Sequence, residues 1–235
     1  MAADDSASAA AASGRAIRSY VRRAGRLTNA QRSAVEQHWP AFGLVPQGSL
    51  DLDAVFGRAA ARYLEIGFGM GDALLEMAAC NPEFDYLGVD VHEPGIGRVL
   101  RGLSEQALGN VKVIRGDAVQ VLREHVPDAS LTGVLVYFPD PWPKKRHHKR
   151  RLIQQTFVQL LAAKLACGGQ LHLATDWEDY ASHMLQVVDA EPLLHNLAGD
   201  GHYSRRPDAR PMTKFEARGT RLGHGVWDLM FERTA

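Results

Sequence analysis

"LEIGFGMGDALLEMA", residues 64–78, is the most informative stretch of this chain for the fold class. It opens with an apolar run, continues through Gly67, Gly69 and Gly71, and ends in an apolar helical pattern. Glycine lets a backbone turn sharply and lets a ligand approach it closely, and Asp72 is placed to cap the helix that follows. The stretch therefore predicts a strand, a ligand-binding loop and a helix. Its spacing is GxGxG and differs from the GxGxxG of dinucleotide-binding loops.

Short apolar runs of the same kind recur along the chain. They end at Gly, Pro or Asp and cover residues 61–66, 84–90, 110–117, 131–138 and 168–175. Helix-length stretches separate them. The clearest spans residues 149–169, stops at Gly168 and has an apolar stripe of Leu152, Phe157, Leu160, Leu161 and Leu165. This alternation predicts an α/β fold with a doubly wound, mainly parallel sheet. The last run, residues 223–233, follows no crossover helix and is expected to return antiparallel.

The length and composition indicate one domain with an arm. A chain of 235 residues with 46% hydrophobic content can build one large α/β core. We expect a disordered tail over residues 1–16, a basic N-terminal arm over 17–50 and the main domain over 51–235. Cys80 and Cys167 are far apart and belong to no CxxC or His-rich motif, so the sequence indicates neither a disulfide framework nor a structural zinc site. This use of cysteine favours a reducing, cytoplasmic location. No apolar stretch reaches the roughly 20 residues that span a bilayer, so no membrane partner is expected.

Charge is balanced overall but uneven along the chain. The formal net charge is zero, yet no acid occurs between Ser6 and Val35, where six arginines lie. Residues 144–151, "KKRHHKRR", hold six more basic side chains in eight positions. Such segments are typical of proteins that hold a polyanion such as nucleic acid, but they are equally typical of a solvated face. Charge alone leaves the two interpretations open.

Acidic residues follow three successive predicted strands. Glu65 precedes the glycine loop, where a carboxylate suits a cationic ligand such as S-adenosyl-L-methionine better than a pyrophosphate. Asp90 ends the second run and can accept from ribose hydroxyls, and Asp117 ends the third and can line an adenine pocket. Each aspartate alone is also a common turn or cap residue. Together with the glycine loop, the three acids predict an S-adenosylmethionine site.

Several longer motifs resemble the bacterial tRNA (guanine-N7)-methyltransferases. They are "YLEIGFGMG", "YLGVDVHEPGIGRVL", "YFPDPWPKKRHHKRR", "LATDWEDYASHML" and "RPMTKFEARGTRLGH", and "IRSYVRRAGRLTNAQ" resembles the N-terminal arm of that family. The resemblance covers the chain from about Ile17 onward, and the PDPWPK and TKFE motifs are more specific than the glycine loop. One position departs from the family pattern, because Asp90 stands where Glu is frequent.

The resemblance implies a Rossmann-like, seven-stranded methyltransferase with an antiparallel C-terminal strand. It implies methyl transfer from S-adenosyl-L-methionine to guanine 46 in the variable loop of tRNA. It further implies that the cofactor site holds Glu65, Gly67, Gly69, Asp90, Asp117 and Asp140. The substrate contacts that it implies are Lys144, Asp176, Thr213, Lys214, Phe215 and Glu216.

Asp140 is the residue to which this chemistry assigns catalysis. Guanine N7 is a bare acceptor, so it attacks a sulfonium methyl with its own lone pair and loses no proton first. Catalysis then requires alignment and stabilisation of the positive charge that moves onto the purine. Asp140 suits both, because a carboxylate can accept from the guanine N1 and N2 hydrogens. Tyr137, Phe138 and Trp142 are candidates to wall a splayed base, and core packing is equally expected for Phe138.

The basic run after Asp140 is expected to begin a helix and to contact tRNA phosphates beside the entering base. The residues with this expected role are Arg146, His147, His148, Lys149, Arg150 and Arg151. The two histidines have no third ligand close in sequence, so no metal is expected. Further basic residues around TKFE are candidates to extend the phosphate track, namely Arg205, Arg206, Arg210, Lys214, Arg218 and Arg221.

Alternative interpretations remain open at this stage. "TDWE" (175–178) and "TKFE" (213–216) also match the S/T-x-x-E capping box, so they can simply start helices. The PDPW turn is similar to the D/N-P-P-aromatic turn of exocyclic-amine methyltransferases, although the second proline is shifted. A noncatalytic RNA-binding protein on a methyltransferase fold is the third possibility. Both a monomer and a homodimer are compatible with the sequence, and it does not identify the tRNA species.

Overall fold

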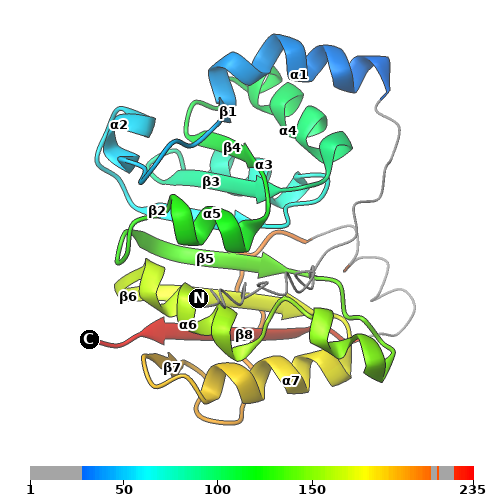
Figure 1. Ribbon diagram of the computed structural model, residues 1–235, viewed down its shortest axis with the longest axis vertical. Coiled ribbons are helices and arrows are strands. Elements are labelled where there is room, and N and C mark those ends of the chain that lie inside the picture. The colour runs from blue at the N-terminus through cyan, green and yellow to red at the C-terminus, as the bar shows by residue number, and fades with distance from the viewer. Residues whose placement is uncertain (1–27, 213–215, 217–224) are drawn as a thin grey trace, which may run out of the picture.

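The computed structural model describes residues 28–212, 216 and 225–235. The expected tail (1–16), the first part of the expected arm (17–27) and Thr213, Lys214 and Phe215 lie outside the described residues. The described chain forms one sheet with helices on both faces (Figure 1). Its strands are β1 (Gly43–Leu44), β2 (Arg62–Ile66), β3 (Asp85–Asp90), β4 (Val111–Arg115), β5 (Leu131–Tyr137), β6 (Leu165–Thr175), β7 (Leu194–Asn196) and β8 (Trp227–Arg233).

The strand order is β1-β4-β3-β2-β5-β6-β8-β7, so the described residues form an eight-stranded sheet. The strands pair in parallel except that β8 runs antiparallel to both β6 and β7. In Figure 1 the arrow of β8 points opposite to that of β5. The doubly wound, mainly parallel sheet and its antiparallel C-terminal strand are therefore confirmed. The expected count of seven strands is one too low, because the two-residue β1 pairs with β4 at the edge.

Helices cover the two faces of the sheet in separate groups. Apolar side chains of α5 (Ala118–Glu124), α6 (Gln155–Lys164) and α7 (Glu178–Asp189) pack in one buried cluster, which also receives Leu64 and Ile66 of β2. Side chains of α3 (Asp72–Cys80) and α4 (Glu93–Glu105) form a second cluster on the other face. Strands buried on both faces read as continuous apolar runs, and every residue of β3 is buried.

The N-terminal part of the described chain packs onto the second cluster. Thr28 and Gln31 form a capping box at the start of α1 (Asn29–Phe42), and Trp39 contacts the cluster from this helix. Gly97 of α4 allows the close approach, since a Cβ there would lie 2.7 Å from the carbonyl oxygen of Gln31. The short α2 (Leu52–Phe56) follows β1. Residues 28–50 of the expected arm thus include α1 and β1, and the latter extends the sheet.

The expected helix over residues 149–169 is wrong in extent. Residues Lys145–Arg150 form a 3₁₀ helix, η1, and α6 begins at Gln155 and ends at Lys164. Leu165 already belongs to β6 and pairs with Leu131, and a register shift follows before Gly133. Gly168 lies within this irregular strand at φ 75° and does not end a helix. An apolar stripe at helical spacing does not distinguish one long helix from a helix followed by a strand. Here the pairing of Leu165 with Leu131 ends the helix.

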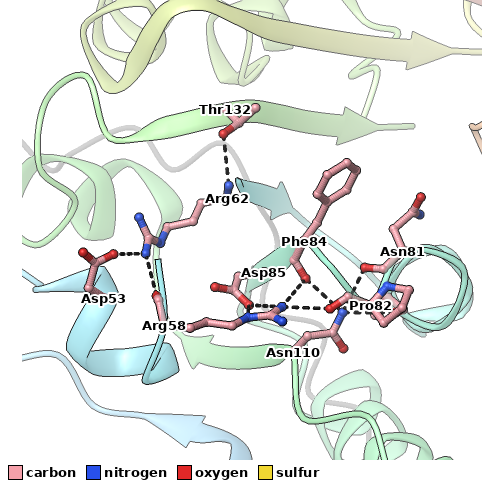
Figure 2. A network of polar contacts seen from close by, with 10 residues as sticks. Asp53, Arg58, Arg62, Asn81, Pro82, Phe84, Asp85, Asn110 and Thr132 are labelled. Atoms are coloured by element: carbon pink, nitrogen blue, oxygen red, sulfur yellow. Dashed lines mark hydrogen bonds and ion pairs between the residues drawn. The ribbon is translucent and has the colours of Figure 1, made fainter. Parts of the chain in front are cut away.

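Polar contacts secure the amino ends of the central strands (Figure 2). The Nε of Arg58 donates to the buried Asp85 at 2.9 Å, and the Nδ2 of Asn110 donates to the carbonyl oxygens of Ala78 and Phe84 at 3.1 and 3.0 Å. The backbone N–H of Arg62 donates to the Thr132 hydroxyl at 3.0 Å. These contacts fix the strands at the end opposite to the site described next.

Candidate active site

A cavity of about 330 Å³ opens at the carboxyl ends of β2, β3, β4 and β5. The chain runs outward from β2 through β3 to β4 and then returns to β5 on the other side of β2. Ligands of doubly wound sheets bind where the strand order reverses in this way. The cavity wall includes five of the sequence-predicted site residues, namely Gly67, Gly69, Asp90, Asp117 and Asp140.

The glycine loop between β2 and α3 forms one wall. Gly67 and Gly69 have φ of 74° and 56°, and a Cβ at either position would meet no heavy atom within 4 Å. Positive φ at these positions is accessible mainly to glycine. Gly71 is the N-cap of α3 and makes no side-chain cap bond, so Asp72 does not cap the helix as expected. Asp72 instead forms an ion pair with Arg98 of α4.

Asp90 connects the end of β3 to that loop. Its Oδ2 accepts the N–H of Gly69 at 2.7 Å, and its Oδ1 accepts the N–H of His92 at 2.8 Å. Burial raises the pKa of Asp90, and these backbone donors partly oppose the effect. A carboxylate oxygen has two acceptor sites, so each oxygen retains capacity for a ligand hydroxyl. The shorter Asp at this position therefore both orders the loop and faces the cavity.

Asp117 combines two roles that the sequence left as alternatives. It is the N-cap of α5, because its Oδ1 accepts the N–H of Val119 at 2.9 Å. It also lines the cavity beside Gly116 and Ala118. The capping interpretation is correct, and at Asp117 the helix cap and the cavity wall coincide.

Glu65 differs from the other predicted acids, since it is not among the residues that line the cavity. Side chains alternate along β2, and Glu65 is buried on the face opposite to Leu64 and Ile66. Its Oε2 has no hydrogen-bond partner among the described residues. Burial, and then the negative charge of Asp90, raise the pKa of Glu65 to about 8. Glu65 is therefore largely protonated at neutral pH.

Asp140 lies on a turn that leaves β5 at the rim of the cavity. The turn begins at Phe138 and reaches Trp142, and both residues have positive φ, 53° and 47°. The N–H of Phe138 donates to the carbonyl oxygen of Ala174 at 2.8 Å, which continues the pairing of β5 with β6. Asp140 itself is exposed. Its carboxylate is thus accessible from solvent and from the cavity.

Tyr137 and Trp142 have partners that limit their expected role as walls for a base. The Tyr137 side chain is buried, and its hydroxyl lies 3.1 Å from Nδ1 of His172. The guanidinium of Arg150 lies 3.8 Å from the centroid of the Trp142 ring, which covers one face of the indole. Phe138 is half-buried, lines the cavity and also packs against the second apolar cluster. Core packing and cavity lining coexist at Phe138.

The basic run is not the start of an α-helix, and its members differ in exposure. Lys144, Arg146 and Lys149 are exposed, and His147, His148 and Arg150 are partly exposed in or beside η1. Arg151 is buried: its side chain is only 1% exposed, and it forms an ion pair with Asp179. The expectation that Arg151 contacts phosphate does not fit this burial.

Asp176 follows β6 and is partly exposed. The TDWE stretch does not form the capping box that the pattern allows, because the N-cap of α7 is Trp177 and makes no side-chain cap bond. The N–H of Trp177 donates instead to the hydroxyl of Thr175 at 3.3 Å. Trp177 is 41% exposed, an aromatic surface beside Asp176 to which the sequence patterns did not point.

Glu216 is the described member of the TKFE motif, and it is buried against two arginines. Its carboxylate accepts from Arg210 at 2.6 and 2.8 Å and from Arg206 at 3.0 Å. Arg210 also pairs with the buried Asp228 at 2.7 Å, and its side chain has no exposed area. Arg210 therefore does not belong to an exposed phosphate track, contrary to expectation.

Three further cavity-lining residues, Met70, His92 and Leu152, carried no signal of their own in the sequence. Met70 directly follows Gly69, and His92 lies two residues after Asp90, so closeness to a predicted residue was the available clue. Leu152 was expected on the apolar stripe of a helix, but it precedes α6. It lies between η1 and α6, and the tertiary structure brings it to the cavity wall.

Comparison with known proteins shows what this chain is similar to. A family model described as "Putative methyltransferase" matches residues 59–229. A relative from Stutzerimonas stutzeri (strain A1501) is 57% identical over 220 residues, 93% of this chain and 92% of its own length. One from Alkalilimnicola ehrlichii is 58% identical and covers 95% of each chain, and one from Thiobacillus denitrificans is 59% identical and covers 92% and 95%. All three are named tRNA (guanine-N(7)-)-methyltransferase.

The chain belongs to the tRNA (guanine-N(7)-)-methyltransferase family. Solved structures agree with the methyltransferase fold at much lower identity. The 16S rRNA methyltransferase KamB is 15% identical, with a TM-score of 0.58 over 83% of this chain and 99% of its own. The cyclase SpnF is 12% identical, with a TM-score of 0.54 over 87% and 92% of the two chains. These likenesses concern the fold alone.

The described part of this methyltransferase has neither a membrane-spanning helix nor a metal-binding cluster. No described helix combines the length and the apolar composition that crossing a membrane requires. Within the same residues, no group of three or more His, Cys, Asp or Glu side chains could hold a metal ion.

Proposed function

We propose that this chain transfers the methyl group of S-adenosyl-L-methionine to N7 of guanine 46 in the variable loop of tRNA. The observation that carries the proposal is the position of Asp140 on the rim of a cavity that also gathers the glycine loop, Asp90 and Asp117. The names of the relatives support tRNA and guanine N7. The motif resemblance supports position 46.

The residues around the cavity fit S-adenosylmethionine. Open space beside Gly67 and Gly69 allows a ligand to approach the loop closely. Asp90 retains acceptor capacity for ribose hydroxyls, and Asp117 lies where the adenine would bind. Glu65 does not line the cavity and is largely protonated at neutral pH, so its proposed cofactor contact would require that the positive charge of the bound ligand lowers its pKa. S-adenosylmethionine, when bound, supplies an electrophilic methyl group on a positively charged sulfur.

Asp140 would orient the guanine. Its carboxylate can accept from the N1 and N2 hydrogens, which directs the N7 edge toward the methyl group. The N7 lone pair forms the new N–C bond as the C–S bond breaks, and the sulfur keeps that electron pair. No proton leaves N7. The positive charge that moves onto the purine is stabilised by the carboxylate, so Asp140 acts by alignment and electrostatics.

The exposed cations beside Asp140 would hold the tRNA backbone. Lys144, Arg146 and Lys149 present their charge to solvent directly after the turn, where they can contact phosphates next to the entering base. His147, His148 and Arg150 are proposed to contact RNA in the same region. The further substrate contacts that we propose are Asp176, Thr213, Lys214 and Phe215. Glu216 is not among them, because it is buried in ion pairs with Arg206 and Arg210.

The exocyclic-amine alternative is less compatible with the turn. An amine must lose a proton on methylation, and the D/N-P-P-aromatic turn that orients such amines has consecutive prolines. Here Trp142 separates Pro141 from Pro143 and adopts positive φ. The noncatalytic alternative is tested by measuring whether the purified chain binds S-adenosylmethionine.

The deciding experiment identifies the product. Purified enzyme is incubated with labelled S-adenosylmethionine and two tRNA transcripts that differ only at position 46, guanine in one and adenine in the other. Nuclease digestion and mass spectrometry then identify the modified nucleoside. We expect 7-methylguanosine from the first transcript and no labelled product from the second. A methyl group on an exocyclic amine, or equal labelling of both transcripts, would contradict the proposal.

A further inference from the structure

The turn that carries Asp140 needs restraint on both sides. Phe138 and Trp142 are not glycine, yet both have left-handed backbone, which L-residues adopt only when their surroundings offset the energetic cost. The bond from the N–H of Phe138 to the carbonyl of Ala174 secures the side next to β5. On the side after Asp140 the chain leads into exposed residues, and none of the described strands pairs with it.

Arg151 contacts that second side of the turn. Its Nε donates to the carbonyl oxygen of Pro141 at 3.0 Å, and Pro141 directly follows Asp140. The Nη2 of the same guanidinium forms an ion pair with Asp179 in the first turn of α7 and lies 3.2 Å from Nε2 of His148. One side chain thus joins the turn, the 3₁₀ helix and α7.

The guanidinium is enclosed as well as hydrogen-bonded. Its carbon lies 4.8 Å from the centroid of the Tyr180 ring. Tyr180 is itself fully buried, and its hydroxyl accepts the N–H of Ile153 at 3.1 Å. The hydrogen bond from Arg151 also holds the pKa of Asp179 below its usual range. With 1% of its side chain exposed, Arg151 does not present its charge to an RNA phosphate.

The contacts require arginine specifically. A guanidinium is planar and donates in several fixed directions, so it can hold a carbonyl and a carboxylate together and stack on an aromatic ring. An ammonium has the same charge but lacks that fork. A role in positioning and a role in phosphate binding therefore respond differently to replacement of Arg151 by lysine.

We propose that Arg151 is a positioning residue, which ties the carbonyl of Pro141 to α7 and thereby holds Asp140 at the cavity rim. This inference rests on the proposed role of Asp140 in methyl transfer. Arg151 thus differs from the exposed cations of the same basic run, to which we assign RNA contact.

The test compares Arg151→Lys with wild type in steady-state methylation of tRNA and in amide hydrogen exchange. We expect kcat to fall about 10- to 100-fold, because small misplacement of a catalytic group has effects of this size. The KM for tRNA and its salt dependence should stay near the wild-type values. Exchange in peptides covering residues 138–148 should rise about tenfold, with the strands unchanged. A wild-type kcat, unchanged exchange, or a raised KM at constant kcat would each overturn the proposal.

Matched variants separate this effect from a general one. Arg101→Lys makes the same replacement on α4, in an exposed pair with Glu105, and should change neither kcat nor exchange. Lys149→Ala removes an exposed cation of the basic run and should raise the KM for tRNA. If wild-type enzyme methylates no tRNA, the proposed function fails, but exchange in residues 138–148 still tests whether Arg151 restrains the turn.

Asp179 provides a second variant that keeps Arg151. Asp179→Ala removes one of the two anchors of the guanidinium, so we expect a smaller loss of kcat in the same direction. The double variant with Arg151→Lys should be no slower than Arg151→Lys alone, since both changes release one restraint. If the losses of kcat in the two single variants multiplied in the double variant, Arg151 and Asp179 would act independently. That result would overturn the proposal that they restrain the turn together.

Discussion

Replacing Glu65 by glutamine should change how the stability of the protein depends on pH. Glu65 is buried on β2, its Oε2 has no partner among the described residues, and its pKa is raised from 4.5 to about 8. Between these two values the unfolded chain has lost the proton of this carboxyl group, whereas the folded protein still binds it. The free energy of unfolding therefore falls as pH rises through this range, and it levels off above about pH 8.

The size of the effect follows from the change in pKa. Each pKa unit corresponds to about 1.4 kcal/mol, so the rise from 4.5 to about 8 costs about 5 kcal/mol of stability once the group is ionised in both states. Between pH 5 and pH 8 the titration is incomplete at both ends, which leaves about 3.5 kcal/mol. Glutamine has nearly the same shape and does not titrate. The stability of Glu65→Gln relative to wild type should therefore rise by about 3.5 kcal/mol over this range.

Urea unfolding followed by circular dichroism at pH 5, 6, 7 and 8 measures the difference. Comparing the two proteins at each pH cancels the titration of other groups and any constant cost of burying the amide. Glu76→Gln, on the exposed side of α3, controls for the loss of one carboxylate. If the curves for wild type and Glu65→Gln run parallel across this range, Glu65 ionises as in the unfolded chain and the reasoning is refuted.

Four further changes test the site and the fold. Asp140→Asn keeps the shape and loses the charge, so single-turnover methylation at saturating cofactor and tRNA should slow by about 10²; a near wild-type rate would leave the aspartate a hinge of the proline turn. Asp90→Ala should weaken S-adenosylmethionine binding by about 1.5–3 kcal/mol, because polar partners lose their acceptor; unchanged affinity by calorimetry in a folded protein would remove it from the site. Changing Lys149 and Arg150 together to Ala should reduce the slope of log affinity for tRNA against log salt by about one per lost phosphate contact, and an unchanged slope would make the run a solvated face. Arg210→Met removes the guanidinium that pairs with two buried carboxylates, Glu216 and Asp228, and should lower the free energy of unfolding by about 3–5 kcal/mol; a loss below about 1 kcal/mol in urea unfolding would contradict the buried network.

The elements that set the cavity were predictable because their signals are local. Glycines at residues 67, 69 and 71 follow an apolar run directly, and the backbone there does adopt positive φ. Asp90 and Asp117 end their apolar runs, and parallel strands bring such ends to the same edge of a sheet. Strand, loop and helix follow one another within a few residues, so no distant partner was needed to predict them. The motif resemblance then pointed to Asp140 on the same edge.

The roles of individual charges depended on contacts between distant parts of the chain. Arg151 and Lys149 belong to one basic run, yet only Arg151 is buried, because folding brings Asp179 and Tyr180 of α7 against it. Arg210 likewise meets Asp228 of β8. A charged residue is expected at the surface unless a partner compensates for its desolvation. Which residue becomes that partner depends on the tertiary structure. For the same reason the sequence determined the glycine loop and the strand-end acids, while only the packed sheet decided that Glu65 is held neutral and that Arg151 holds the turn.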